Sequence, residues 1–153
     1  MGRMVLIKQA KWLLPAGYKY HTVDIQWYEP ESVRHWYKEG AKLEMDEYGR
    51  LLPVVKKFPS AAGGKGFKPL ADYVHSKGLK FTIHMMRGIP RQAVAQNTPV
   101  LGTSFRAKDI ANVNDKCAWN PDKFGVDMTK LDKFTLAFSL INRLPSRSAV
   151  RAS

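Results

Sequence analysis

The sequence predicts an α/β protein whose strands run parallel. Two buried strands are expected, over residues 18–27 and 79–85, and each follows a helix that a glycine ends. Both strands are nearly continuous in apolar, aromatic and β-branched residues, as in parallel strands covered on both faces. Both also finish in polar side chains, which is how a parallel sheet presents a site at the carboxyl ends of its strands. This order of helices and strands favours right-handed crossover connections.

The first element is a predicted helix over residues 4–14. Met4, Ile7 and Leu14 lie on one side of it, and the Pro-Ala-Gly sequence that closes at Gly17 ends it. The strand of residues 18–27 then follows directly.

Two side chains at the end of this first strand suit a sugar ligand. Asp24 is expected to bind hydroxyl groups, to serve as an acid or base, or to cap a neighbouring loop. Trp27 offers a ring face for stacking on a sugar, although a tryptophan more often only packs. Residues 29–65 are polar and rich in Pro and Gly, yet they contain aromatic residues such as Trp36 and Tyr48. We therefore expect an ordered, irregular excursion over the strand ends.

The clearest helix is predicted over residues 66–77. Its apolar residues recur at i, i+3, i+4 and i+7, as Phe67, Leu70, Ala71 and Val74. Pro69 lies in the first turn, where proline is tolerated, and Gly78 ends the helix.

The second strand, over residues 79–85, is followed by His84 at its end and by Arg87 just beyond. A histidine at a strand end is more often hydrogen-bonded structure than a catalyst. Arg87 is expected to pair with a carboxylate, and a substrate clamp is the alternative.

The remainder of the chain predicts little sheet. Residues 88–121 are expected to form loops with single helical turns, and residues 129–142 to form a helix that Pro145 ends. The apolar face of that helix carries Leu131, Phe134, Ala137, Phe138 and Ile141. We therefore expect one domain over residues 1–145 and a disordered basic tail over residues 146–153.

Composition excludes several classes of protein. The chain has 153 residues with 44% hydrophobic and 25% charged content, which is ordinary for a globular domain. It contains no apolar run long enough for a membrane span and no recognisable signal peptide, and its compartment is not assigned. Cys117 is the only cysteine, and the four histidines lack metal-ligand spacing, so no metal and no cofactor are expected. The net charge of +12 is spread along the chain, which makes nucleic acid an unlikely partner.

Several short sequence motifs, taken in order, resemble those of the melibiase-type α-galactosidases, which are glycoside hydrolases of clan D. The words are Val23–Pro30, Asp46–Arg50, Phe58–Ser60, Gly64–Phe67, Gly78–Phe81, Ile83–Val94, Cys117–Pro121 and Gly125–Met128. The resemblance covers roughly residues 10–130 and is specific, because the words occur in the family's order.

The resemblance implies an incomplete (β/α)₈ (TIM) barrel and a galactoside as the carbohydrate partner. In this family, two aspartates hydrolyse terminal α-galactosides with retention. Asp24 matches the family's carboxylate that holds sugar hydroxyls, and Trp27 matches its aromatic wall. His84 falls where the family has a polar pocket residue, Arg87 follows it, and Trp119 belongs to a loop over the pocket.

The family's catalytic pair is not recognisable. Residues 125–132 fit the family word that ends in the nucleophile, which would be Asp132. The alternative, which we favour, makes Thr129 the N-cap of the helix that follows, with Asp132 in its first turn. The family's first strand and its later acid/base aspartate have no counterpart in the chain.

We therefore expect a fragment that resembles a retaining α-galactosidase and is inactive alone. A non-catalytic carbohydrate-binding or assembly module is one alternative, and a basic nucleic-acid-associated protein is another. The exposed strand edges of an unclosed sheet are expected to favour self-association.

Overall fold

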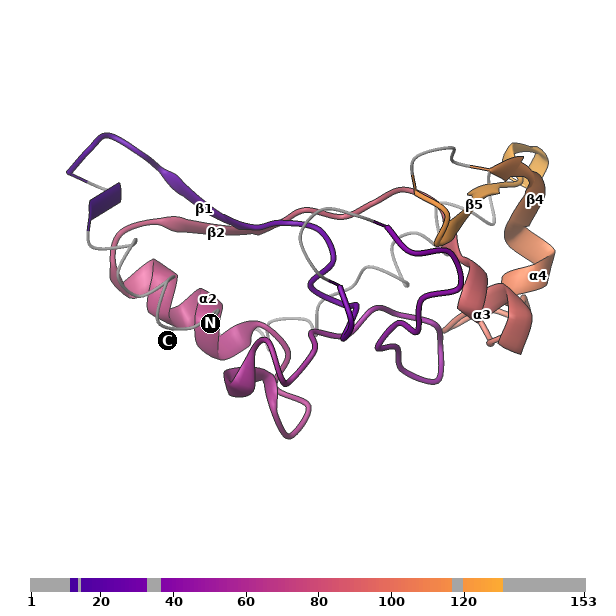
Figure 1. Cartoon of the computed structure of the whole chain (residues 1–153), viewed down its shortest axis with the longest axis horizontal. Helices are drawn as coiled ribbons and strands as arrows, with labels where there is room; N and C mark the ends of the chain where they lie inside the picture. The colour runs from indigo at the N-terminus through magenta and orange to yellow at the C-terminus, as the bar shows by residue number, and fades with distance from the viewer. Residues whose placement is uncertain (1–11, 14, 33–36, 117–119, 131–153) are drawn as a thin grey trace, which may run out of the picture.

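The computed structural model of the protein describes residues 12, 13, 15–32, 37–116 and 120–130. Within these residues, a parallel pair of strands lies over one helix, and a small antiparallel sheet with two short helices lies at the opposite end (Figure 1). The predicted α/β composition is therefore confirmed, whereas the sheet is not parallel throughout.

The two predicted strands lie side by side in the same direction. Strand β1 (Tyr20–Val23) pairs with strand β2 (Lys80–Ile83), with Tyr20 opposite Lys80 and Val23 opposite Ile83. Both strands are shorter than predicted. Residues after Val23 turn instead of continuing the strand, and Gln26 adopts a positive φ of 66° that no strand residue has.

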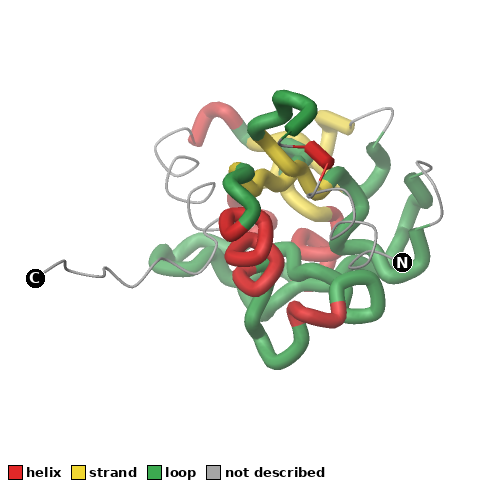
Figure 2. Tube along the Cα trace, turned by 90° about the vertical axis from the view of Figure 1, so that its left-hand side faces the viewer, coloured by secondary structure: helices red, strands yellow, loops and turns green. Residues whose placement is uncertain are grey.

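The predicted helix between these strands is confirmed as α2 (Lys68–Ser76). Pro69 lies at its start, where the missing amide hydrogen removes no helical bond, and Gly78 follows its end with a φ of +76°. The helix buries Leu70 and Val74. The tube view shows this helix below the strands (Figure 2). Within the described residues, a helix therefore covers the parallel pair on one face only.

The excursion predicted after β1 is ordered and irregular where the structure describes it. It contains the 3-10 helix η1 (Pro59–Ala61) and an isolated antiparallel bridge between Met45 and Leu51. The Asp46 carboxylate accepts hydrogen bonds from the backbone amides of Tyr48 and Arg50, which closes the turn between the bridge residues. Trp36 lies outside the described residues.

The single helical turns expected within residues 88–121 are present, but the prediction that the rest of this part is loop is wrong. This part of the chain forms an antiparallel sheet in the order β3-β5-β4, together with two short helices. The elements are β3 (Ile89–Pro90), α3 (Arg91–Gln96), α4 (Ala107–Ile110), β4 (Ala111–Lys116) and β5 (Lys123–Val126). Strand β3 has two residues and β4 is largely polar, so neither carries the hydrophobic pattern from which strands are predicted.

The predicted helices at the two ends fall mostly outside the described residues. Only residues 12 and 13 of the helix over 4–14 are described, and the tail over 146–153 is not. The 3-10 helix η2 (Met128–Lys130) opens the segment predicted as a helix over 129–142. Thr129 lies inside η2, and the Asp127 carboxylate accepts its backbone amide at 3.0 Å, so Asp127 takes the capping place predicted for Thr129.

One side chain ties the excursion to the antiparallel region. The Gln92 amide accepts the backbone N–H of Leu43 at 2.8 Å and donates to the backbone carbonyl of the same residue at 3.0 Å. Gln92 therefore binds the excursion as a neighbouring strand would.

Candidate functional site

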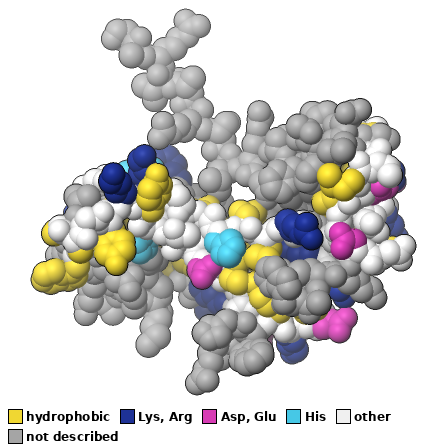
Figure 3. Space-filling view, turned by 90° about the horizontal axis from the view of Figure 1, so that it is seen from above, with side chains coloured by type: hydrophobic (Ala, Val, Ile, Leu, Met, Phe, Trp, Pro, Cys, Tyr) yellow, Lys and Arg dark blue, Asp and Glu magenta, His cyan; other side chains and the backbone are white. Residues whose placement is uncertain are grey.

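The open face of the parallel pair carries three cross-strand pairs in a row. Side chains alternate between the two faces of a strand, so one face of β1 and β2 holds mainly polar groups and the other meets α2. The three pairs on the open face are Tyr20 with Lys80, Thr22 with Thr82, and Asp24 with His84. The face seen from above shows histidine, acidic and basic side chains between hydrophobic ones (Figure 3).

Asp24 and His84 form the last of these pairs, at the carboxyl ends of the strands. Asp24 Oδ1 lies 2.6 Å from His84 Nδ1 and also accepts the backbone N–H of Ile25 at 2.8 Å. The hydrogen bond with His84 lowers the pKa of the Asp24 carboxyl, so the group is ionised at neutral pH. A carboxylate only accepts, so Nδ1 of His84 carries the hydrogen. The shared position predicted for these two residues is therefore present.

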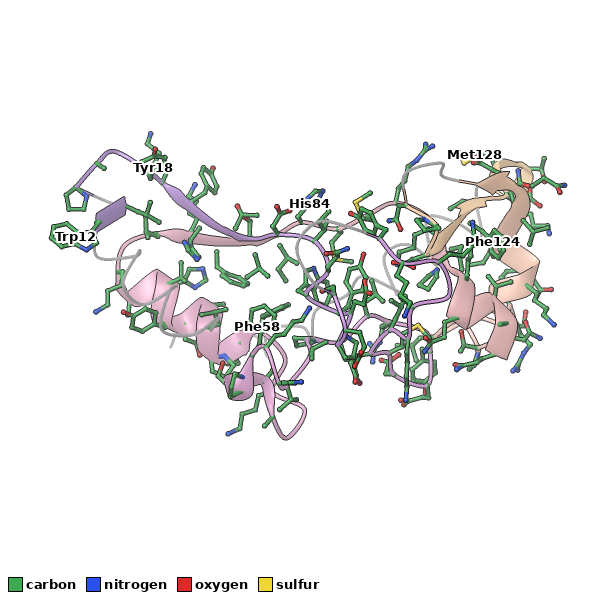
Figure 4. The ribbon with its side chains drawn as sticks, viewed as in Figure 1. Trp12, Tyr18, Phe58, His84, Phe124 and Met128 are labelled. Carbon is green, nitrogen blue, oxygen red and sulfur yellow. The ribbon has the colours of Figure 1, made fainter. Side chains whose placement is uncertain are left out.

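The pair is open to solvent and to a ligand. The side chain of Asp24 is 79% exposed and that of His84 is 47% exposed. His84 lies on the side of the ribbon away from Phe58 and α2 (Figure 4). The free oxygen of Asp24 and the outer ring nitrogen of His84 can therefore bind hydroxyl groups.

Trp27 lies in the core and not on the open face. It is 5% exposed, and its ring meets Tyr28 and Phe67 edge to face at 5.1 Å and 5.2 Å. Its indole Nε1–H donates to the backbone carbonyl of His84 at 3.0 Å. In the described conformation, Trp27 cannot stack on a sugar at the open face, and it instead fixes the position of His84.

The other two predicted site residues, Arg87 and Trp119, make no described contact with the Asp24–His84 pair. Arg87 is exposed between β2 and β3, and within the described ranges it forms no ion pair with a carboxylate. The carboxylate partner expected for Arg87 is thus not seen in this part of the chain. Trp119 lies outside the described residues, as do Cys117 and Asp132.

The loop after β1 is held in place by Lys57. The Lys57 ammonium donates to the backbone carbonyl of Gln26 at 3.2 Å and also to the hydroxyl of Ser32. Gln26 is itself buried, and its positive φ turns the chain away from the strand direction. This turn keeps the strand from continuing past Val23, so the Asp24 carboxylate lies at the end of the strand.

Sequence reasoning missed a buried polar cluster behind this loop. Glu29, Asp122 and Lys123 are each at most 4% exposed, and the Lys123 ammonium lies 5.1 Å from the ring centroid of the buried Tyr28. Burial raises the pKa of Glu29 and of Asp122, and it lowers the pKa of Lys123 to about 8. The cluster joins the β1 loop to the start of β5. The only sequence signal was a carboxylate next to a proline in each loop.

Metal chemistry finds no support in the described ranges. No group of three or more His, Cys, Asp or Glu side chains there is arranged to hold a metal ion. No described helix has both the length and the apolar content to cross a bilayer.

A hollow in this part of the molecule lies mainly on the opposite face of the strands. It has a volume of about 690 Å³ and is mainly apolar, with Phe67, Phe81 and Ile83 among its lining residues. Since Phe81 and Ile83 point away from the face that carries His84, this hollow and the polar pair are separate features.

No family model matches the chain. Several curated relatives match. The chain is 36% identical over 115 residues to α-galactosidase 3 of Arabidopsis thaliana, which covers 74% of this chain and 22% of that protein. It is 38% identical over 116 residues to the α-N-acetylgalactosaminidase of Gallus gallus, which covers 76% of this chain and 22% of that protein.

A solved structure matches more closely. The β-L-arabinopyranosidase of Geobacillus stearothermophilus, from glycoside hydrolase family 27, superposes with a TM-score of 0.81 and 57% identity. The match covers 88% of this chain and 31% of that one. A variant of the same enzyme in complex with arabinose matches with a TM-score of 0.76 and 60% identity over 81% of this chain. The chain thus spans about a fifth of the length of the curated relatives and about a third of the solved enzyme.

Proposed function

We propose that this chain, which resembles part of a melibiase-type α-galactosidase, carries one side of a sugar-binding pocket. The relatives confirm the resemblance. The observation that carries the proposal is the Asp24–His84 pair. The two side chains meet at 2.6 Å, at the carboxyl ends of neighbouring parallel strands, and both are exposed. This edge is where an α/β sheet places its ligand.

The proposed ligand is the terminal sugar of an α-galactoside or of a β-L-arabinopyranoside. The two rings share the arrangement of their ring hydroxyls and differ in the group on C5, so one set of hydroxyl contacts serves both. The ionised Asp24 accepts from hydroxyls, and His84 offers its outer nitrogen. Arg87 and Trp119 are proposed to complete the contacts, and Trp27 acts through His84.

We propose that the fold is an incomplete (β/α)₈ barrel, which the parallel pairing of β1 with β2 supports. Here β1 and β2 are two neighbouring barrel strands, α2 covers their outer face, and the open face is the one that would line the barrel. A complete barrel takes roughly 250 residues, more than the chain provides.

We further propose that the chain alone does not hydrolyse its ligand. Retaining hydrolysis needs two carboxyl groups about 5 Å apart. Asp24 is engaged by His84, and the described residues bring no second carboxylate into contact with either of them. Binding without turnover is therefore the expected behaviour.

The proposal is tested by titrating the chain with methyl β-L-arabinopyranoside and with methyl α-galactoside, followed by chemical-shift changes in the protein. Asp24→Asn should abolish the shifts near the strand ends, because the amide replaces an acceptor oxygen with a donor. Asp72→Asn is the matched control, since Asp72 is an exposed carboxylate on α2 that pairs with Lys68. Hydrolysis of a chromogenic glycoside by the pure chain, or shifts that survive in Asp24→Asn, would contradict the proposal.

An assembly module is the second candidate, and one observation favours it. Tyr18 and Tyr20 are 59% and 54% exposed beside a strand pair that has no further strand on either side in the described part of the chain. Such edges and faces invite pairing with another chain. Sedimentation velocity across a hundredfold range of concentration, about 1 to 100 μM, distinguishes the two, because assembly predicts concentration-dependent mass that Tyr20→Lys removes.

A further inference from the structure

Gln26 has a backbone conformation that its residue type rarely adopts. Its φ of +66° lies in the left-handed region, where the Cβ of an ordinary residue crowds the following carbonyl oxygen. Among the described residues, Asn97 is the other non-glycine residue with a positive φ, and it lies at the C-cap of α3, where asparagine is tolerated. Gln26 instead lies buried in a turn. Such a conformation persists only where the surrounding structure holds it.

Several contacts converge on the backbone carbonyl of Gln26. Within the described residues, this oxygen accepts the Glu29 amide at 3.2 Å, the Lys57 ammonium at 3.2 Å and the Ser32 hydroxyl at 3.4 Å. Lys57 also donates to the Ser32 hydroxyl, so its ammonium ties together two points of one loop. A hydrogen bond from a charged donor is stronger than one from a neutral donor. Lys57 is therefore a strong restraint on the turn, and it comes from the excursion and not from the loop itself.

Lys57 is itself fixed against the same loop. The Val54 N–H donates to the backbone carbonyl of Trp27 at 3.0 Å. The Val54 carbonyl in turn accepts the N–H groups of Lys57 and Phe58, at 2.9 Å and 2.8 Å. The turn that carries Lys57 is thus attached to the residue that follows Gln26, so the ammonium reaches Gln26 from a fixed direction.

The turn at Gln26 positions both members of the Asp24–His84 pair. Asp24 precedes Gln26 by two residues, at the point where β1 stops. Trp27 follows Gln26 directly, and its indole N–H donates to the backbone carbonyl of His84 at 3.0 Å. A change of φ at Gln26 would therefore move Trp27 relative to Asp24, and the support of His84 would move with it.

We propose that Lys57 is a positioning residue for the proposed sugar-binding pair, and that it acts by holding Gln26 in the left-handed conformation. The inference rests on the proposed function, since it gives Lys57 a role at the same site. Without the ammonium, Gln26 relaxes to a negative φ, Trp27 loses its hydrogen bond to His84, and the pair separates. A glycine in place of Gln26 needs no such restraint, because it has no Cβ.

The first test removes the ammonium and measures the turn without any ligand. Lys57→Met keeps an apolar stem, and Lys56→Met, at the exposed neighbouring position, is the matched control. The readout is the hydrogen exchange of the Trp27 indole N–H, followed by NMR. Lys57→Met should raise its rate about tenfold or more, whereas Lys56→Met should change it less than about twofold. An unchanged rate in Lys57→Met would overturn the proposal.

Rescue at Gln26 shows whether Lys57 acts through the backbone conformation. Gln26→Gly and Gln26→Ala lose the same amide group, but only the alanine keeps a Cβ. Combined with Lys57→Met, Gln26→Gly should return the exchange rate to within about threefold of the parent protein, and Gln26→Ala should not. Equal rates in the two double variants would overturn the proposal.

The same comparison works if Lys57→Met does not fold. With Lys57 present, Gln26→Gly should exchange its Trp27 indole N–H at least about threefold more slowly than Gln26→Ala, because only the alanine is strained. Equal rates in these single variants would show that the positive φ places no demand on Lys57, and would contradict the proposal.

Sugar titrations separate failure of this inference from failure of the proposed function. Methyl β-L-arabinopyranoside should bind about tenfold more weakly to Lys57→Met than to the parent, and Gln26→Gly should restore the affinity. Equal affinity in the parent and in Lys57→Met would overturn the role of Lys57 while the sugar site stands. No binding to the parent would contradict the proposed function, and the exchange rates alone would then decide whether Lys57 holds the turn.

Discussion

The two sheets of this molecule differ in how their faces are covered. The β3-β5-β4 sheet meets its own apolar cluster, which α3 and α4 complete with residues that include Ala93, Val94 and Ile110. The β1–β2 pair is covered on one face by α2, and its other face exposes Tyr20, Thr22 and Asp24. The antiparallel sheet therefore packs on an apolar cluster of its own, whereas one face of the parallel pair stays exposed. The exposed face is also where the proposed sugar-binding groups lie.

Phe67→Ala should have the largest effect on the free energy of unfolding. This variant tests whether the parallel region can unfold by itself. Phe67 is 4% exposed and packs on Trp27, Phe58 and Phe81. Removing the ring should cost about 3–5 kcal/mol of unfolding free energy in urea titrations. We expect amides of α2 and β2 to lose protection from exchange while those of β4 and β5 keep theirs. Equal loss in both regions would mean that the molecule unfolds as one unit.

Gly88→Ala should come next, because it strains the junction between the two sheets. Gly88 has a φ of +101°, and a Cβ there would lie 2.4 Å from the backbone carbonyl of Phe124. We expect a loss of about 2–4 kcal/mol by thermal or urea unfolding. Gly40→Ala is the control, since Gly40 has a similar positive φ with open space around it, and it should cost only about 1 kcal/mol. Equal losses in the two variants would show that Phe124 does not crowd Gly88.

The pH dependence of stability reports on the buried cluster that joins the β1 loop to β5. Burial lowers the pKa of Lys123 from 10.5 to about 8, so between these values the unfolded chain holds a proton that the folded chain has released. Stability should therefore rise with pH in this range, by about 1–3 kcal/mol in total. Lys57 acts in the same direction, whereas the raised pKa of Tyr28 acts in the opposite one at higher pH.

Thermal melts between pH 7.5 and pH 9.5 check this expectation below the titration of tyrosine. Lys123→Met should flatten most of the rise, because it removes the group whose pKa folding lowers. A rise that persists unchanged in Lys123→Met would assign it to another group.

Gln92→Ala should have the smallest effect of the four. It removes both hydrogen bonds to the backbone of Leu43 and so loosens the excursion from the antiparallel region. We expect a loss of about 1–2 kcal/mol, with Gln96→Ala, at the exposed end of the same helix, as a near-neutral control. Amides near Leu43 should exchange faster in Gln92→Ala alone.

Short-range pattern predicted the parallel region and failed for the antiparallel one. The i, i+3, i+4 spacing from Phe67 to Val74 identified α2, and the pairing of β1 with β2 followed from two similar helix–strand units. Strand β4 reads Ala-Asn-Val-Asn-Asp-Lys, and it is a strand because β5 lies beside it and not because of its own composition. The local sequence of a strand does not show which other strand will pair with it.

In the candidate site too, residues at recognisable strand ends were predicted, and residues brought together only by the fold were not. Asp24 and His84 were predicted because each follows a recognisable strand, and they meet as expected. Trp27 was expected beside them, but the positive φ of Gln26 turns the chain and sends the indole into the core. The buried carboxylates of Glu29 and Asp122 come from loops far apart in the sequence, so only the folded chain brings them together.

The hydrogen bond from Trp27 to His84 makes tryptophan fluorescence a way to test the proposed binding edge. An indole in apolar surroundings emits at shorter wavelength than one in water, and this one donates to the very residue whose side chain would touch a sugar. With Trp12, Trp36 and Trp119 replaced by phenylalanine, the emission of the remaining tryptophan would report, without a label, whether the proposed sugar binds.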